Sequence, residues 1–217
     1  MSLFESFLSQ FQKAFIVDNR WKIFLKGFIN TMVITLAAAA IGILIGVVIA
    51  VFRYMASQKD PRKKRTFGSV VIGVIDRLMA AYVAVIRGTP LAIQLMIMAF
   101  IVLRGVSDGM VVAIVAFGLN SGAYVSEVIR AGIQSVDGGQ MEAGRSLGLN
   151  YFDTMRFIVI PQAIKAILPA LGNEFIILLK DTSLITVIGG KELLHAAQGI
   201  MGRTYEAMFP LIGIACM

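Results

Sequence analysis

Long apolar runs alternate with short polar segments along this chain. A helix rises about 1.5 Å per residue, so roughly 20 apolar residues cross the hydrocarbon core of a membrane. Residues 27–52 contain no charge and predict a first span, 109–126 predict a third, and 157–179 predict a fourth. The pattern therefore predicts an all-α membrane protein.

The region between the first and third spans is interrupted twice. Asp76 and Arg77 fall inside the apolar residues 69–86, which we interpret as a helix lying partly in the cytoplasmic interface. Pro90 lacks an N–H and restricts the residue before it, so it predicts a helix break. The uncharged residues 88–103 then predict a short second span that runs outward.

Charge sets the expected orientation. Residues 53–65 carry six basic side chains against one acid, Asp60, which places this loop in the cytoplasm and the N-terminus outside. The net charge is +7, but 58% of the residues are hydrophobic and 15% are charged. Such a composition excludes a soluble nucleic-acid-binding protein, and we interpret the loop as a solvated topological signal.

The N-terminal residues 1–26 predict a helix that lies in the membrane interface. One helical face collects five apolar side chains, Phe4, Phe7, Leu8, Phe11 and Phe15, and Ser2 and Glu5 have capping-box spacing. A signal peptide is the alternative, but Glu5 stands where a basic residue belongs and no small-residue cleavage site follows. We therefore expect an uncleaved chain.

Small and polar residues inside the predicted spans have two interpretations. Gly42 and Gly46 would let another helix approach closely. Asn120, Ser121 and Tyr124 form a polar patch in the third span, and such groups seek either a partner helix or a water-filled path. Both interpretations of this patch stay open.

Ionisable residues in the fourth span are candidates for ligand binding. Pro161 and Pro169 predict a broken helix there, and broken helices with charges are tolerated where they line a cavity or an interface. Glu174 and Asp181 are seven residues apart and share a helical face, which suits a cationic ammonium or guanidinium group. Alternatively, Glu174 pairs with a basic residue of a neighbouring helix and Asp181 marks the outer surface.

Residues 137–161 form the longest polar insert between apolar segments. Glu142, Ala143, Gly144 and Leu147 have helical spacing, Gly148 can close this helix in a left-handed cap, and Asn150 with Asp153 can open the next helix. The pattern predicts helix, Gly break, helix. Such a short ordered helix between spans suits a protruding element that another protein binds. An ordinary amphipathic connector is the alternative.

This insert resembles the EAA loop of bacterial ABC importer permeases, from Glu142-Ala143-Gly144 to Ile158-Val159-Ile160-Pro161. The family usually has Ala at the position of Gly144 and Leu at that of Ile160. In that family the loop forms a cytoplasmic coupling helix that docks into a groove of the ATPase, and we refer to residues 137–161 as the coupling segment. The resemblance implies ATPase coupling by Glu142, Ala143, Gly144, Arg145, Leu147 and Gly148.

Two further strings resemble the polar amino acid branch of these permeases. They are Arg87-Gly88-Thr89-Pro90 with Gln94, and residues 172–175 together with 179–184. The resemblance covers most of residues 20–217 and implies a type I ABC importer fold with about five transmembrane helices. It implies helix breaks at Arg87, Gly88, Thr89, Pro90, Pro161 and Pro169, and a substrate pathway along Asn120, Ser121, Tyr124, Asn173, Glu174, Asp181, Thr182 and Ser183.

By resemblance, the partners are a cytoplasmic ABC ATPase dimer, a second permease subunit in a homo- or heterodimer, an extracytoplasmic amino acid binding protein and the lipid of a bacterial inner membrane. The domain of 27–217 would be the permease domain. The family ends with a full fifth span and a basic tail, so the eleven residues 207–217 lead us to expect a truncated last span.

The sequence offers little for enzymatic chemistry. It has no Gly-rich phosphate loop, so ATP must be hydrolysed by a partner, and it shows no nucleophile or zinc-hydrolase motif. One cysteine, Cys216, and one histidine, His195, predict neither a metal site nor a cofactor. A passive channel or membrane scaffold protein is the alternative to a permease subunit.

Overall fold

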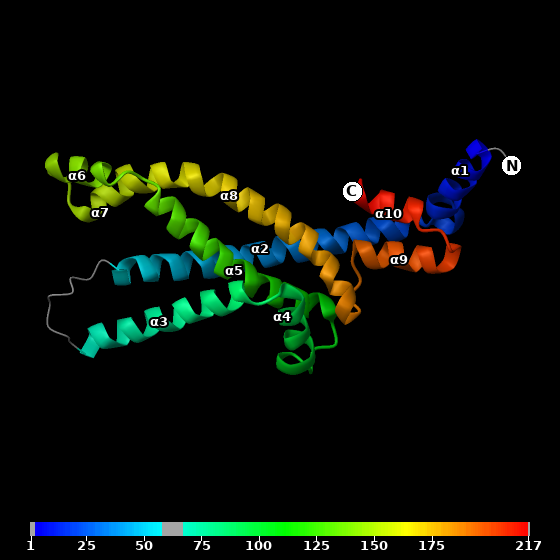
Figure 1. Cartoon of the computed structure of the whole chain (residues 1–217), viewed down its shortest axis with the longest axis horizontal. Helices are drawn as coiled ribbons and strands as arrows, with labels where there is room; N and C mark the ends of the chain where they lie inside the picture. The colour runs from blue at the N-terminus through cyan, green and yellow to red at the C-terminus, as the bar shows by residue number, and fades with distance from the viewer. Residues whose placement is uncertain (1–2, 58–66, 217) are drawn as a thin grey trace. The chain divides into compact units, whose positions relative to one another are not determined.

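The computed structural model describes residues 3–57 and 67–216, and helices account for most of them (Figure 1). In chain order the elements are α1 (Leu3–Phe11), η1 (Gln12–Ile16), η2 (Val17–Asn19), α2 (Trp21–Ser57), α3 (Phe67–Gly88), α4 (Leu91–Ile97), η3 (Met98–Val102), α5 (Gly109–Gln134), α6 (Gly138–Ser146), α7 (Tyr151–Thr154), η4 (Met155–Val159), α8 (Ile160–Asp181), η5 (Thr182–Ile188), α9 (Leu193–Thr204) and α10 (Met208–Ala215). Ser2 and the basic residues 59–65, used above for capping and orientation, lie outside the described residues.

Four helices in the described part of the chain are long and apolar enough to cross a membrane. They are α2, α3, α5 and the continuous helical run Tyr151–Ile188. The predicted spans 27–52, 109–126 and 157–179 each fall inside one of these helices, so these three predictions are confirmed.

Residues 69–86 are helical as predicted and belong to α3, whose 22 residues have the length and hydropathy of a span; their interfacial position stays a prediction. The expected second span 88–103 forms a shorter apolar helix over Leu91–Val102. Asp76 lies inside α3, and its carboxylate is 3.5 Å from the Arg53 guanidinium, an ion pair that offsets its charge. The break predicted at Pro90 is confirmed, since α3 ends at Gly88 and α4 begins at Leu91.

The predicted break at Pro169 is wrong. Pro169 lies inside α8, which continues without interruption to Asp181. A proline removes one backbone hydrogen bond, but the bonds on either side can hold the helix together. Pro161 is the second residue of α8, and α8 directly follows the π-helical turn η4, which interrupts the α-helical register before it.

The chain divides into two compact units. The terminal unit combines the chain up to Ala38 with Ala92–Ala116 and the residues from Leu178 onward, and the central unit combines Ala39–Leu91 with Phe117–Ile177. α2, α5 and α8 each contribute one part to each unit.

Aromatic contacts organise the core of the terminal unit. Phe24 is fully buried beside Ala197 and Ile200 of α9. The rings of Phe7 and Phe209 lie 4.8 Å apart, edge to face, and this contact places part of the apolar face of α1 against α10. The remainder of that face stays open to the surroundings, since Phe4 is 72% exposed.

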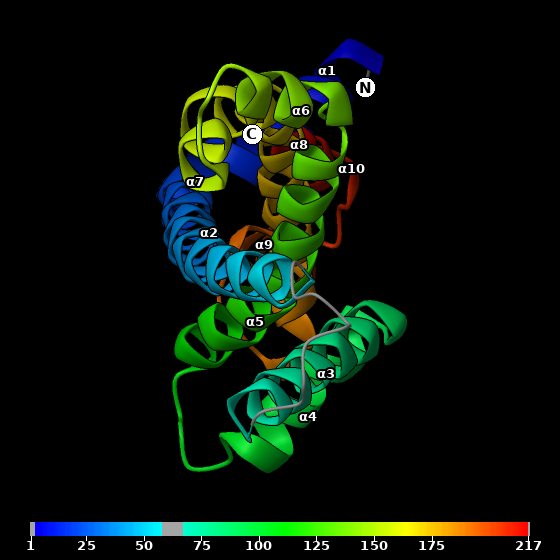
Figure 2. The ribbon, with the colours of Figure 1, turned by 90° about the vertical axis from the view of Figure 1, so that its left-hand side faces the viewer.

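Small residues bring α2 and α5 together in the central unit (Figure 2). A Cβ added at Gly42 would lie 2.7 Å from the Ser121 side chain, and one added at Gly46 would lie 2.5 Å from Val125. The predicted close approach at these two glycines is thus confirmed, because neither position has room for a side chain.

Candidate functional site

Capping side chains define the starts of the two helices of the coupling segment. The Asp137 carboxylate accepts a hydrogen bond from the Gly139 N–H at 2.6 Å and so caps α6. The Asn150 side chain accepts from the Asp153 N–H at 2.9 Å, and its amide donates to the Asp153 carboxylate at 2.6 Å. The predicted start of the second helix at Asn150 is therefore confirmed.

The end of α6 is a Schellman motif built on Gly148. Gly148 has a φ of +86°, which a glycine adopts without strain. Its N–H bonds to the Arg145 carbonyl at 3.0 Å, and the Leu149 N–H bonds to the Gly144 carbonyl at 3.1 Å. This is the left-handed cap expected from the sequence, and it fixes the angle between α6 and the following turn.

Gly144 sets the distance between α6 and the helix that follows it. A Cβ at this position would lie 2.5 Å from the Thr154 methyl group and 3.0 Å from the Ile158 side chain. Thr154 is itself fully buried, so it has little room to move away. The glycine in place of the usual alanine therefore allows a closer contact between α6 and the Thr154–Ile158 region.

The outer surface of the coupling segment carries both charge and exposed apolar area. Glu142, Ala143 and Arg145 are exposed, and Leu147 is 81% exposed at the end of α6. In Figures 1 and 2, α6 and α7 lie together at the C-terminal end of α5. This arrangement combines a rigid helix with a protruding leucine, which suits insertion into a groove of another protein.

A second polar feature of the central unit centres on Glu127 of α5. The carboxylate lies 2.6 Å from Arg130, 3.4 Å from Arg53 and 3.6 Å from Arg87, measured between N and O atoms. Arg53 of α2 also lies 3.5 Å from Asp76 of α3. We call these five residues the Glu127 cluster; three cations and two anions leave it with a formal charge of +1.

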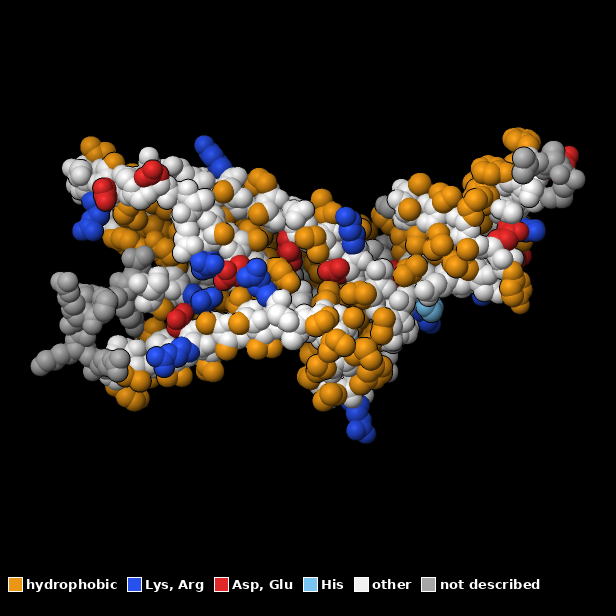
Figure 3. All heavy atoms as spheres, viewed as in Figure 1, with side chains coloured by type: hydrophobic (Ala, Val, Ile, Leu, Met, Phe, Trp, Pro, Cys, Tyr) orange, Lys and Arg blue, Asp and Glu red, His pale blue; other side chains and the backbone are white. Residues whose placement is uncertain are grey.

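An open groove with a volume of 490 Å³ lies beside the Glu127 cluster. Its walls are formed by Arg53, Ala80, Val83, Ala84, Arg87, Gly88, Tyr124 and Glu127. The Arg87 guanidinium lies 5.3 Å from the centre of the Tyr124 ring, within the range of a cation–π interaction. Figure 3 shows acidic and basic side chains gathered over the region between α3 and α5. The groove therefore presents cationic, anionic and aromatic groups together.

The sequence does not predict this cluster, although three of its members stand out. Arg53 falls in the predicted cytoplasmic loop, Asp76 in the predicted interfacial helix and Arg87 at a predicted helix break. The available signal was the presence of opposite charges within or next to several apolar helices, since such charges seek one another. The partners themselves could not be read from the sequence.

The predicted pathway residues on α5 divide into two environments. Ser121 is 2% exposed and lies where α5 packs against Gly42, which favours the packing interpretation for this residue. Asn120 is also buried. Tyr124, by contrast, lines the groove beside Arg87. The polar patch therefore does not face one common cavity.

The predicted pathway residues of α8 and η5 are likewise divided. In the central unit, Asn173 is exposed and Glu174 is partly buried. In the terminal unit, the hydroxyls of Thr182 and Ser183 donate to backbone carbonyls of the preceding turn at 2.7 and 2.8 Å. Asp181 is partly buried, and α8 remains helical from Glu174 to Asp181, so the expected spacing along one helix is present.

The helix-break residues cap the end of α3. The Thr89 hydroxyl donates to the Val85 carbonyl at 2.8 Å, one turn earlier, and Arg87 reaches the Glu127 cluster. Gly88 lines the groove, and Pro90 precedes α4.

Glu192 is a buried capping residue of the terminal unit that the sequence analysis did not identify. Its carboxylate accepts from the N–H groups of Leu194 and His195 at 2.6 and 2.7 Å and thereby caps α9. Burial raises the pKa of this carboxyl above its usual value, while the two N–H groups act in the opposite direction.

A hydrogen bond connects α2 to the segment just before α9. The Asn30 amide donates to the Lys191 carbonyl at 2.7 Å.

Within residues 3–57 and 67–216, no group of three or more His, Cys, Asp or Glu side chains is placed to hold a metal ion. His195 lies on α9 and is partly buried, and Cys216 is exposed. The polar chemistry described above therefore consists of ion pairs, hydrogen bonds and helix caps.

Comparison with known proteins places these features in a family. Residues 67–217 match the family described as binding-protein-dependent transport system inner membrane component. The arginine transport system permease protein ArtQ of Bacillus subtilis is 40% identical over 191 residues, which are 87% of this chain and 80% of that protein. The glutamine transport system permease protein GlnP of Escherichia coli (strain K12) is 39% identical over 150 residues, 66% of each protein.

A solved structure shares the same architecture. The crystal structure of an amino acid ABC transporter with histidines is 40% identical and has a TM-score of 0.77, covering 90% of this chain and 85% of that chain. The all-α fold of a type I ABC importer transmembrane domain, predicted from the sequence, is confirmed by this likeness.

Proposed function

The chain belongs to the family of binding-protein-dependent transport system inner membrane components, and from this membership we propose that it is the permease subunit of an importer for polar amino acids. Members of this family are permease subunits of ABC importers, and ATP is hydrolysed by a separate subunit. Relatives named for arginine and glutamine transport support an amino acid substrate. The observation that carries the proposal is the coupling segment, a rigid and exposed helical knob between two spanning helices.

The coupling segment supplies the proposed ATPase contact. Glu142 and Arg145 offer opposite charges for ion pairs, and the exposed Leu147 offers an apolar anchor. The caps at Asp137 and Gly148 hold this surface in one conformation before the partner binds. A pre-organised helix loses little conformational entropy on docking, so movement of the ATPase is passed to the permease as a rigid-body displacement.

The groove beside the Glu127 cluster supplies a proposed contact for substrate. At neutral pH an amino acid carries a carboxylate and an ammonium group. In the groove, Arg87 can bind the carboxylate, and Glu127 with the Tyr124 ring can bind the ammonium group. The groove volume of 490 Å³ lies within the range of roughly 300–1,000 Å³ typical of small-molecule sites. Glu174 of the central unit is a separate candidate for selectivity toward a cationic side chain.

The working complex that we propose contains more than this chain. A second permease subunit, identical or related, completes the pathway, two ATPase subunits dock on the coupling segments, and a binding protein delivers the amino acid. The basic loop 53–65 supports a cytoplasmic position for the coupling segment and an external N-terminus. Closure of the ATPase pair would then alternate access to the pathway between the two sides of the membrane.

Reconstitution tests this proposal and separates it from a passive channel. The permease is reconstituted in liposomes with its ATPase and binding protein, and uptake of labelled amino acids is measured with and without ATP. ATP-dependent uptake of polar amino acids is expected, whereas flux without nucleotide would favour a channel and no flux would favour a scaffold.

A pair of variants tests the groove. Arg87→Gln should raise the KM for uptake because it removes the proposed partner of the substrate carboxylate. Arg104→Gln is the matched control, since Arg104 is exposed on the connection between η3 and α5. Equal KM values for the two variants would remove Arg87 from the proposed site.

A further inference from the structure

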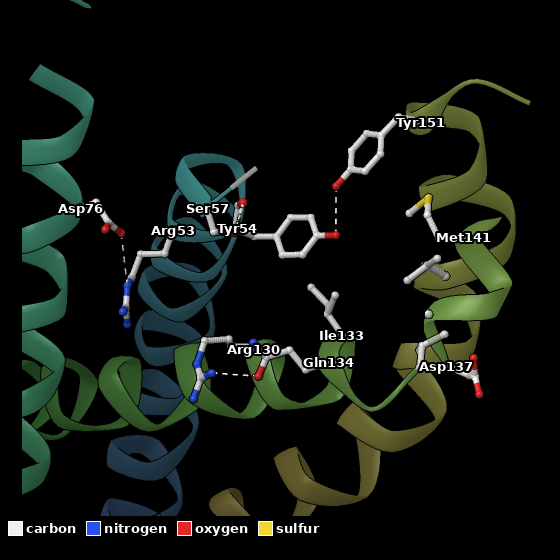
Figure 4. Close-up of a pocket in the computed structure, with 13 residues that line it drawn as sticks. Arg53, Tyr54, Ser57, Asp76, Arg130, Ile133, Gln134, Asp137, Met141 and Tyr151 are labelled. Carbon is white, nitrogen blue, oxygen red and sulfur yellow. Dashed lines mark hydrogen bonds and ion pairs between the residues drawn. The ribbon is translucent and has the colours of Figure 1, made fainter. Parts of the chain in front are cut away.

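Two tyrosines connect α2 directly to the coupling segment. The Tyr151 hydroxyl at the start of α7 donates to the Tyr54 hydroxyl at 2.9 Å, and the Tyr54 hydroxyl donates in turn to the Met155 sulfur at 3.4 Å. Figure 4 shows the two phenol groups extending toward each other from α2 and α7. The two residues are 97 positions apart in the sequence, so this contact exists only in the folded protein.

A pocket rather than a packed interface surrounds this contact. The pocket has a volume of 420 Å³ and is bounded by α2, α3, α5, α6, α7 and η4. Its walls include Tyr54 and Ser57 on one side and Met141 and Tyr151 on another (Figure 4). The hydroxyl pair is therefore a directional link between α2 and α7 beside an open space.

Tyr54 lies next to Arg53 on α2, and Arg53 reaches the Glu127 cluster. Its guanidinium lies 3.4 Å from the Glu127 carboxylate and 3.5 Å from the Asp76 carboxylate. Two adjacent residues of one helix therefore contact the coupling segment on one side and the charged cluster on the other. A shift of α7 that pulls on Tyr54 would also displace Arg53, because a helix moves its neighbouring residues together.

We propose that Tyr54 and Tyr151 are positioning residues that transmit displacement of the coupling segment to α2 and, through Arg53, to the Glu127 cluster. The inference rests on the proposed function, since it assumes that an ATPase moves the coupling segment. The tyrosines act through Arg53 and do not touch the proposed substrate groove, whose walls contain neither of them.

A double-mutant cycle tests this link. The variants Tyr54→Phe, Tyr151→Phe and the double variant are reconstituted with the ATPase and binding protein, and the amount of amino acid taken up per ATP hydrolysed is measured. A neutral hydrogen bond contributes roughly a two- to twelvefold change in an equilibrium constant. We expect each single variant to lower uptake per ATP by about two- to fivefold, at the lower end of that range.

The geometry also predicts the order of the effects. Tyr54→Phe removes both the bond from Tyr151 and the bond to Met155, so it should have at least the effect of Tyr151→Phe. The double variant should resemble Tyr54→Phe, because the second hydroxyl has no remaining partner in the pair.

Tyr82→Phe is the matched control. The Tyr82 hydroxyl donates to the Leu119 carbonyl and links α3 to α5, so its loss also removes one interhelical hydrogen bond, but this bond does not involve the coupling segment. Uptake per ATP should stay at the wild-type value in this variant, even where thermal stability falls.

The outcomes separate this inference from the proposed function. Without ATP-dependent uptake by the wild type, the proposed function fails and the inference fails with it. If the wild type is active and both tyrosine variants keep its uptake per ATP, the link alone is refuted. The link is also refuted if the double variant loses uptake per ATP by the product of the two single losses, because the hydroxyls would then act independently. An equal loss in Tyr82→Phe would refute it as well, because the effect would then come from reduced stability.

Discussion

Replacing Glu127 with glutamine should expose the energetic role of the charged cluster in the central unit. The variant keeps the size of the side chain and one carbonyl acceptor but removes the negative charge shared by three arginines. Arg130 loses its 2.6 Å ion pair, and Arg53 and Arg87 lose contacts of 3.4 and 3.6 Å. The cluster then holds three guanidinium groups against the single carboxylate of Asp76.

The expected cost follows from burial. Removing one partner of a buried ion pair costs about 3–5 kcal/mol, and a hydrogen bond to a charged group contributes about 1.5–3 kcal/mol. The Glu127 side chain is 17% exposed, but the three arginine side chains are 26–44% exposed and water partly screens them. We therefore expect a loss of about 3 kcal/mol, at the low end of the buried range.

Thermal unfolding of the permease in lipid nanodiscs, followed by far-ultraviolet circular dichroism, measures this loss. For a chain of this size, about 3 kcal/mol lowers the midpoint by roughly 6–12 °C. Asp76→Asn is the matched control, because among the described residues its carboxylate has one ion pair, at 3.5 Å, and its side chain is 36% exposed. It should lower the free energy of unfolding by about 0.5–1 kcal/mol.

A second substitution sharpens the test. Adding Arg130→Gln to Glu127→Gln removes one unneutralised cation and should restore part of the lost stability. The reasoning is refuted if Glu127→Gln and Asp76→Asn shift the midpoint equally, or if the double variant is no more stable than Glu127→Gln alone.

Four further substitutions test the coupling segment and α8. Gly144→Ala places a Cβ 2.5 Å from the Thr154 methyl group and should lower unfolding stability by about 1–3 kcal/mol, whereas Gly172→Ala has open space and should raise it by about 0.5–1 kcal/mol; equal midpoints for the two in thermal unfolding would contradict this. Glu142→Lys reverses the one acidic charge of α6 and should uncouple ATP hydrolysis from uptake without changing membrane insertion; unchanged ATP-driven uptake would show that Glu142 has no such role. Glu174→Gln should weaken uptake of cationic amino acids more than neutral ones, and equal losses for both in the liposome assay would exclude Glu174 as a selectivity residue.

Features that depend on neighbouring residues were predictable from the sequence. The spans containing residues 27–52, 109–126 and 157–179 follow from hydropathy and length, which are local quantities. The left-handed cap at Gly148 and the helix start at Asn150 follow from backbone preferences and from hydrogen bonds over three or four residues. The close approach at Gly42 and Gly46 was also foreseen, although not its partner helix.

Features that depend on distant residues were decided by the tertiary structure. The ion pair between Asp76 of α3 and Arg53 of α2 is one such feature, because the sequence of α3 shows the acid but not its partner. Pro169 stays inside α8 because one missing bond does not outweigh the rest of a long helix.

The shape of the coupling segment depends on nearby residues, whereas its contacts with other helices depend on distant ones. Its caps arise within a few residues, so the sequence by itself determined the shape of the knob. Arg53 reaches Glu127 across 74 positions and Tyr54 meets Tyr151 across 97, and neither contact leaves a pattern in the local sequence. Which charges neutralise one another, and which helix the coupling segment is tied to, are therefore properties of the packed helices, because only packing brings such distant side chains within bonding distance.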